Sequence, residues 1–197
     1  MSTRRLVGFY LLSRRVPAAL AALVAGAVAL HLVLHWTPTS GSFATVLPLL
    51  VVGAAAAVVG ASLRSPFDES ERATGVRLPV LRGATSTGLT AIGYGVLALG
   101  AADAHLTLGA VGLLRDLAGV VGVTLLVAAL GSGNLAWLGT LSYLLLAITA
   151  VPLGWTTPWL WPARPPTDHG AAICAGLAFL AGLAAVTIRG ARDSGRD

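Results

Sequence analysis

The sequence predicts an all-α fold, a polytopic helical membrane bundle with about six transmembrane helices. Hydrophobic residues make up 56 % of the 197 residues and charged residues only 11 %, whereas a soluble domain contains roughly 25 % charged residues. Six apolar segments reach or approach the length of about 20 residues that a helix needs to cross the hydrocarbon core. Basic residues flank these segments, as orientation signals do in membrane proteins. Much of the surface is therefore expected to face lipid.

The expected transmembrane domain covers residues 16–188, between a cytoplasmic N-terminal segment, residues 1–15, and a cytoplasmic tail, residues 189–197. The six expected spans are residues 16–36, 43–63, 83–102, 108–130, 137–155 and 170–188. Because further apolar segments follow the first, that segment is expected to be a retained helix. A cleaved signal peptide has a shorter apolar core and a polar mature chain after it.

Charged and turn-forming residues separate the first three spans. The first span follows Arg14 and Arg15, and the turn-like stretch 37–41 closes it before the second span. The third span is bracketed by Arg82 and Asp103. These residues are typical of the boundaries between spans, because Pro, Gly and Ser favour turns and charged residues favour the membrane surface.

The last three spans are separated by a Gly-rich stretch, residues 131–134, and a Pro- and Trp-rich stretch, residues 155–161. Tryptophan prefers the headgroup level of a membrane, so the second stretch is expected to lie at the outer surface. The fourth span carries Arg115 and Asp116 near its start. The number of spans and the side of the C-terminus therefore depend on this segment.

The distribution of arginine predicts the orientation. All thirteen basic residues are Arg. With six spans and a cytoplasmic N-terminus, eleven of them lie on the inner side, and only Arg115 and Arg164 lie on the outer side. Positive residues favour the cytoplasmic side. The sequence thus predicts a multi-pass protein of the plasma membrane with both termini in the cytoplasm.

Small residues recur four positions apart within the spans, which allows the backbones of helices in lipid to approach closely. An Ala- and Gly-rich chain also produces such pairs by chance. The pairs are Ala22 with Gly26, Gly53 with Ala57, and Ala178 with Gly182.

The largest polar insertion, residues 64–75, follows the second span. Ser65 and Pro66 suit the first positions of a short helix, and acidic residues follow at its positive end. We interpret this loop as a docking element for a cytoplasmic partner, although a capped, solvated connector has the same pattern. The expected docking residues are Phe67, Asp68, Glu69, Glu71 and Arg72.

Arg115 and Asp116 form an unusual intramembrane charged pair, because ionisable residues in membrane segments are costly and are often functional. Neighbouring helical residues point about 100° apart, so each side chain is expected to find another partner. Asp103 and Asp168 are the candidate partners for Arg115. The alternative is an interfacial pair that ends the helix or extends to the headgroups.

All four histidines fall on the expected outer side, and two of them, His31 and His35, share one face of the first span. His105 and His169 lie in expected outer loops near acidic residues. Two His at this spacing with a carboxylate are a weak candidate for a metal or proton-relay site. No H-E-x-x-H motif accompanies them, so no metal is predicted.

The sequence predicts no enzyme and no cofactor. A P-loop requires a Lys, which the chain lacks, and no G-x-S-x-G motif is present. The net charge of +5 does not indicate nucleic-acid binding, because the Arg residues flank apolar segments and do not form a patch with stacking aromatics. The lone Cys174 excludes an intrachain disulfide.

The layout resembles the membrane subunits of ABC-2-type exporters, which have six spans, a cytoplasmic N-terminus and an inner loop after the second span that contacts a separate ATPase. In this chain the corresponding contact segment runs from Pro66 to Arg72. The stretch 113–122, which contains Arg115 and Asp116, is also similar to small actinobacterial multi-pass membrane proteins. The chain is shorter than the exporter pattern, with only residues 153–168 for the hairpins between the last two spans.

The resemblance implies a permease-like subunit of an ABC-type exporter that moves a hydrophobic or amphipathic substrate with a cytoplasmic ATP-binding subunit. Its expected partners are the lipid bilayer, this ATPase and further copies or other subunits of an oligomer, but no nucleic acid. Two alternatives stay open. One is a non-transporting membrane scaffold or regulatory protein, and the other is an intramembrane enzyme or a metal site at the outer face.

Overall fold

The computed structural model describes residues 15–36, 42–62, 77–102, 109–131, 135–150, 153 and 157–189. This part of the chain is all-helical, as the sequence predicts, and contains no β-strand. Its helices are α2 (Val16–Trp36), α3 (Ser42–Ala61), α5 (Arg77–Gly100), α6 (Gly109–Leu130), α7 (Ala136–Ala150), the short 3-10 helix η2 (Trp161–Ala163) and α8 (His169–Arg189).

The helices occupy the six apolar segments, and only two of their bounds differ from the expected ones by more than two residues. Helix α5 begins at Arg77, before the expected residue 83, because a helix can continue through polar residues that an apolar window leaves out. Helix α7 ends at Ala150, before the expected residue 155. The residues that follow it, 151 and 152, lie outside the described part of the chain.

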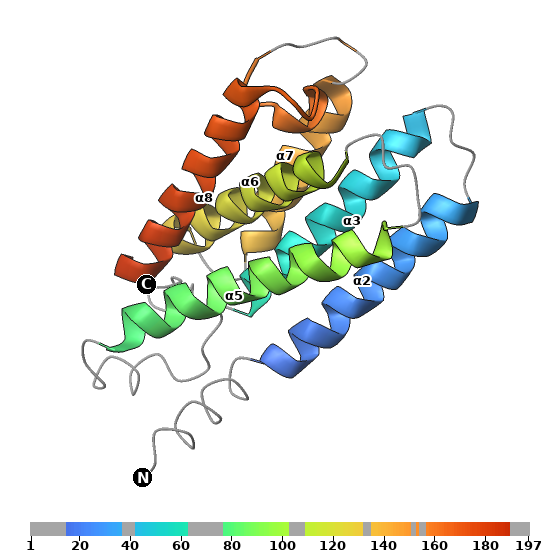
Figure 1. Cartoon of the computed structure of the whole chain (residues 1–197). Coiled ribbons are helices and arrows are strands. Elements are labelled where there is room, and N and C mark those ends of the chain that lie inside the picture. The colour runs from blue at the N-terminus through green and yellow to red at the C-terminus, as the bar shows by residue number, and fades with distance from the viewer. Residues whose placement is uncertain are drawn as a thin grey trace.

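Successive helices run in alternating directions along one bundle axis (Figure 1). The beginnings of α2 and α5 and the ends of α3 and α8 lie at one end of the bundle. The ends of α2 and α5 and the beginnings of α6 and α8 lie at the other end. Arg15, Arg82 and Arg189 therefore belong to the first end, and Arg115 to the second.

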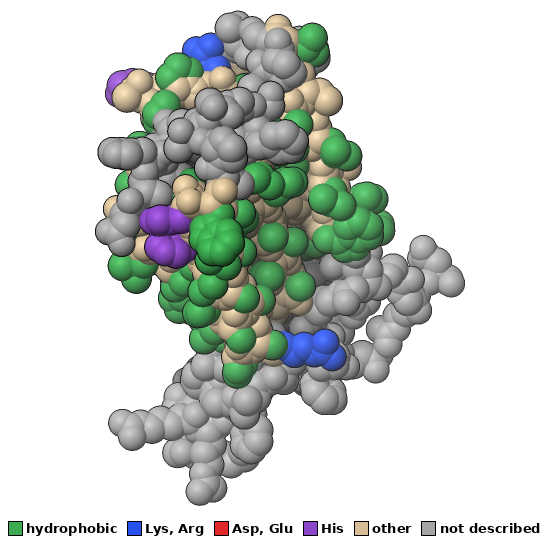
Figure 2. All heavy atoms as spheres, turned by 90° about the vertical axis from the view of Figure 1, so that its right-hand side faces the viewer, with side chains coloured by type: hydrophobic (Ala, Val, Ile, Leu, Met, Phe, Trp, Pro, Cys, Tyr) green, Lys and Arg blue, Asp and Glu red, His purple; other side chains and the backbone are tan. Residues whose placement is uncertain are grey.

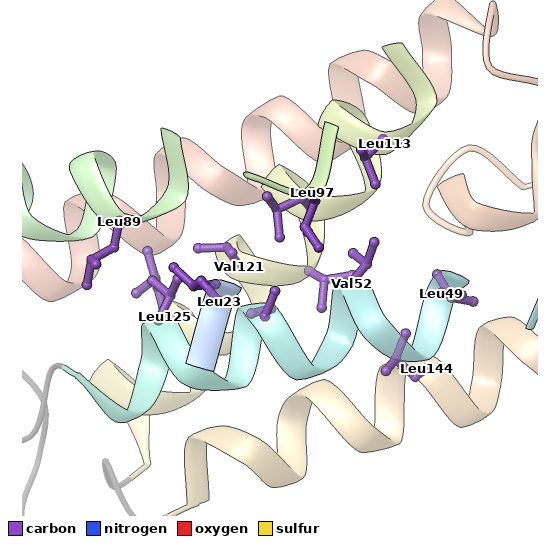
Figure 3. Packing of buried hydrophobic residues seen from close by; sticks show 14 of the residues in the cluster. Leu23, Leu49, Val52, Leu89, Leu97, Leu113, Val121, Leu125 and Leu144 are labelled. Atoms are coloured by element: carbon purple, nitrogen blue, oxygen red, sulfur yellow. The ribbon is translucent and has the colours of Figure 1, made fainter. Parts of the chain in front are cut away.

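Helix α6 lies at the centre of the bundle. It packs against α3, α5, α7, α8 and η2, whereas α2 packs against α3 and α5. Leucine and valine side chains from neighbouring helices point toward one another in this core (Figure 3). Leu113, Val121 and Leu125 of α6 are fully buried there. Because α6 has neighbours on most sides, its polar residues lie inside the protein.

Three of the described helices, α2, α6 and α8, are long and apolar enough to cross a membrane. Helices α3 and α7 contribute shorter apolar stretches. The face drawn in Figure 2 has hydrophobic side chains over its middle and arginine side chains toward its two ends. These features are compatible with a membrane protein.

Close contact between α6 and α8 depends on two glycines. A Cβ atom on Gly122 would overlap the backbone of Ala178 and Phe179, and one on Gly182 would overlap the carbonyl of Gly122. The pair Ala178 and Gly182 is thus at a tight helix interface. Gly26, from another of the three pairs, has only a side-chain atom of Val51 at 4.0 Å. Small-residue spacing alone therefore does not identify the interface.

Substitution of two glycines in α8 tests this packing. Gly182→Ala is expected to destabilise the protein by about 1–3 kcal/mol, because the new methyl group forces the two backbones apart. Gly176→Ala is the matched control, since no atom lies within 4 Å of its Cβ position, and it is expected to be neutral or stabilising by up to about 1 kcal/mol. Thermal unfolding of both purified variants in detergent measures the difference. Equal unfolding midpoints would show that the α6–α8 contact is not tight.

Candidate functional site

The candidate site lies in the first half of α6. Arg115 and Asp116 are about two turns from the beginning of this helix. Their side chains are only 2 % and 0 % exposed. Both charged side chains are thus enclosed by the bundle, and they do not end the helix. The helix continues to Leu130.

The two charged side chains bind each other. The Nε atom of Arg115 donates to Oδ1 of Asp116 at 2.9 Å. The expectation of another partner is therefore confirmed for Arg115 but not, among the described residues, for Asp116. The helical angle between neighbours concerns the Cβ directions, and the long arginine side chain curves around the helix to its neighbour. Asp168 binds Arg164 instead, and Asp103 lies outside the described residues.

Arg115 also binds the segment that precedes α8. Its Nη1 atom donates to the carbonyl oxygen of Pro165 at 2.7 Å, and its Nη2 atom donates to that of Arg164 at 3.1 Å. We call residues 157–168 the cap segment, because they lie against the first half of α6 and against α7 and α8 at this end of the bundle. The guanidinium thus joins the central helix, the Asp116 carboxylate and the cap segment through hydrogen bonds with a fixed planar geometry.

A second ion pair orders the end of the cap segment. Nε of Arg164 donates to Oδ2 of Asp168 at 2.6 Å, and Oδ1 of Asp168 accepts the backbone N–H of Ala171 at 3.1 Å. Asp168 is therefore the N-cap of α8, where a carboxylate is favoured by the unpaired N–H groups and the helix dipole. The Ala171 hydrogen bond, followed by that from Arg164, holds the pKa of Asp168 below its usual value.

Aromatic side chains attach the cap segment to the bundle. The Trp161 ring stacks on Tyr143 of α7, with centroids 4.7 Å apart, and the Tyr143 hydroxyl donates to the carbonyl of Trp159 at 3.0 Å. Trp161 lies directly against Gly119, which has no room for a Cβ atom. Trp161 is only 3 % exposed, whereas Trp159 is 44 % exposed. Trp161 is thus buried inside the bundle, where Gly119 leaves room for its ring, whereas Trp159 lies at the surface.

Tyr143, Trp161 and Gly119 were not identified from the sequence as site residues. A glycine one turn after a buried charge, together with a Trp in a nearby loop, is too common a pattern to predict their contact.

Two buried polar atoms at this site have no hydrogen-bond partner among the described residues. They are Oδ2 of Asp116 and Nε1 of Trp161, an acceptor and a donor. An unpaired buried polar atom costs about 1–3 kcal/mol. The hydrogen-bonding capacity of the site is therefore not fully used by the described residues, since one acceptor and one donor are left unpaired.

The other predicted site residues are only partly described. His31 and His35 of α2 lie next to each other, and His169 is the exposed first residue of α8. His105 lies outside the described residues. Within the described part, no three His, Cys, Asp or Glu side chains are grouped as metal ligands.

The expected docking residues also fall outside the part of the chain that the structure describes. They are Phe67, Asp68, Glu69, Glu71 and Arg72. The end of α3 and the beginning of α5, which flank these residues in the sequence, lie at the same end of the bundle (Figure 1).

A double-mutant cycle tests the coupling of the buried pair. Arg115→Leu is expected to cost about 3–5 kcal/mol of stability, because Asp116 is left buried without its counter-ion. The double variant Arg115→Leu, Asp116→Leu is expected to be more stable than the sum of the single changes implies. Chemical or thermal unfolding in detergent of Arg115→Leu, Asp116→Leu and the double variant gives the three values. Arg164→Leu is the control, since its ion pair is more exposed and its loss is expected to cost less. Additive effects at residues 115 and 116 would contradict a direct interaction.

Comparisons with known proteins identify no relative for this arrangement. No family model matches the chain, and no curated protein and no solved structure matches it. The functional argument therefore depends on the residues of this chain alone.

Proposed function

We propose that the chain is a permease-like membrane subunit of an exporter that works with a separate cytoplasmic ATPase. The single observation that carries this proposal is the Arg115–Asp116 pair, buried in the central helix and bonded to the cap segment. Ionisable residues inside membrane proteins mark substrate pathways and moving parts more often than purely structural positions. A charged pair that joins the central helix to a segment over its end is suited to gating.

The gating step follows from the contacts of Arg115. A shift of α6 relative to α8 changes the distance from the guanidinium to the carbonyl oxygens of Arg164 and Pro165. When those bonds break, the cap segment loses its hydrogen bonds to α6, and the Trp161–Tyr143 contact and the buried Leu160 still hold it to the bundle. The unpaired atoms of Asp116 and Trp161 then offer an acceptor and a donor to the polar end of an amphipathic substrate. The cap segment is thus the proposed outer gate.

The proposal includes six spans, both termini in the cytoplasm and a place in the plasma membrane. The positions of Arg15, Arg82 and Arg189 at one end of the bundle support this orientation, since arginine favours the cytoplasmic side. Helix α7 has 15 residues and a length of about 22 Å. A hydrocarbon core is about 30 Å thick, so the fifth span needs the residues that flank α7 or a locally thinner bilayer.

The docking part of the proposal concerns the loop between α3 and α5. Both helices reach that loop at the end of the bundle that carries Arg15 and Arg189. The loop contains Asp68, Glu69 and Glu71, which give this arginine-rich side a local acidic surface. An ATP-binding subunit with a basic groove is the partner that such a surface would complement.

A non-transporting scaffold or regulator is the alternative. The hydrogen bonds of Arg115 to two backbone carbonyls favour it, because they also stabilise the cap segment without any movement. An ATP-binding subunit encoded next to this chain would favour transport over the scaffold.

Charge reversal in the loop tests the exporter proposal. The full-length chain, purified in mild detergent from its own cells, is expected to co-elute with ATP hydrolysis and with a polypeptide that an azido-ATP probe labels. Glu69→Lys is expected to reduce both signals by about tenfold, because it opposes a basic docking surface. Asp103→Lys is the matched control, since its loop is expected on the opposite side of the membrane. The proposal fails if the wild type co-elutes with no ATPase, or if Glu69→Lys and Asp103→Lys behave alike.

A further inference from the structure

Two histidines lie side by side near the end of α2. His31 and His35 are one helical turn apart, and their ring centroids are separated by 4.1 Å with an interplanar angle of 37°. His31 is half-buried and His35 is exposed. Histidine side chains are visible next to one another at the surface, beside hydrophobic side chains, in Figure 2. The pair is separate from the Arg115 site and has no part in the proposed gate.

Hydrogen bonds place the proton of each ring on the same nitrogen. Nδ1 of His31 lies 3.1 Å from the carbonyl oxygen of Gly100, and Nδ1 of His35 lies 2.8 Å from that of His31. A carbonyl oxygen only accepts, so each Nδ1 carries a hydrogen, and in the neutral form of each ring the Nε2 atom carries a lone pair. Neither Nε2 atom has a partner among the described residues. Metal-binding histidines are commonly held in this way, with the second ring nitrogen donating to a backbone carbonyl.

The surrounding backbone favours a cation. Helix α2 ends at Trp36 and helix α5 ends at Gly100, so the carbonyl ends of two helices meet at the histidine pair. The C-terminus of a helix carries partial negative charge. A Cβ atom on Gly100 would overlap the carbonyl of Ala27, so glycine is required for the approach that brings the Gly100 carbonyl to His31.

We propose that His31 and His35 chelate one transition-metal ion of the class that prefers imidazole, such as Cu²⁺, Ni²⁺ or Zn²⁺, through their Nε2 atoms. Two histidines at i and i+4 on one helix face are a recurrent pair of zinc ligands. With metal–nitrogen bonds of about 2.0–2.1 Å, the ring centroids of the two ligands would be roughly 5 Å apart. A side-chain rotation of the exposed His35 provides this small opening from the present 4.1 Å.

The remaining coordination positions are open. The described residues supply no third ligand in a group with these two histidines. Water or an external molecule would therefore complete the coordination, which is typical of an exchangeable site and not of a structural one. The site is at the end of the bundle opposite Arg15 and Arg189, where an ion outside the cell would have access in the proposed orientation.

Titration of the full-length protein in detergent with Cu²⁺ tests the proposed chelate. The electron paramagnetic resonance spectrum of the bound Cu²⁺ shows how many nitrogen atoms coordinate it. The wild type is expected to bind one Cu²⁺ with coupling to two imidazole nitrogens. His35→Gln is expected to show one such nitrogen and a Kd at least about tenfold weaker, because the second ligand no longer acts within the same molecule. Among the described residues His35 bonds only to its own helix, so its replacement is expected to leave the α2–α5 contact unchanged.

Two controls separate chelation from histidine content. The double variant Leu32→His, His35→Leu keeps the number of histidines but turns the second ring about 100° away from His31, so it is expected to behave like His35→Gln. His169→Gln removes an exposed histidine at the beginning of α8 and is expected to bind like the wild type. The inference is overturned if the wild type shows no two-nitrogen signal. It is also overturned if the shifted double variant retains both the signal and the affinity.

Discussion

The buried ion pair between Arg115 and Asp116 is the constraint on which the rest of the structure depends. Taking two charges out of water is costly, and the mutual attraction offsets that cost only if the remaining hydrogen-bonding groups are also satisfied. The cap segment supplies two carbonyl oxygens to Arg115, while Oδ2 of Asp116 is left without a partner among the described residues. The central place of α6 and the fold of residues 157–168 are thus parts of one electrostatic arrangement.

The same arrangement explains the packing around α6. Gly119 leaves space for the ring of Trp161, and Gly122 lets α8 approach the backbone of α6. One helix therefore carries a charged pair, an aromatic contact and a close helix contact within two turns. All these contacts are made by α6. A displacement of α8 would therefore act on α6 at Gly122, and Arg115 would carry the effect from α6 to the cap segment. This coupling is the physical basis for the proposed gate.

Hydropathy was sufficient to predict the all-α class and the positions of the helices, since long apolar segments separated by Gly, Pro and Arg leave few other folds. Charge in an apolar segment was also sufficient to identify Arg115 and Asp116 as unusual. The pairing of these two residues was not predictable, because it depends on the reach of a long side chain. The burial of Trp161 depends on a contact with Gly119 between distant parts of the chain, which no local pattern reveals.

The central claim, that α6 crosses the membrane with the ion pair inside, is tested most directly by cysteine labelling. In a Cys174→Ala background, Ala110→Cys and Gly131→Cys place thiols at exposed positions at the two ends of α6. A membrane-impermeant maleimide is expected to label position 110 in intact cells, and position 131 only after the membrane is permeabilised. Labelling of both positions from the same side would contradict the account, because α6 would then not cross the bilayer.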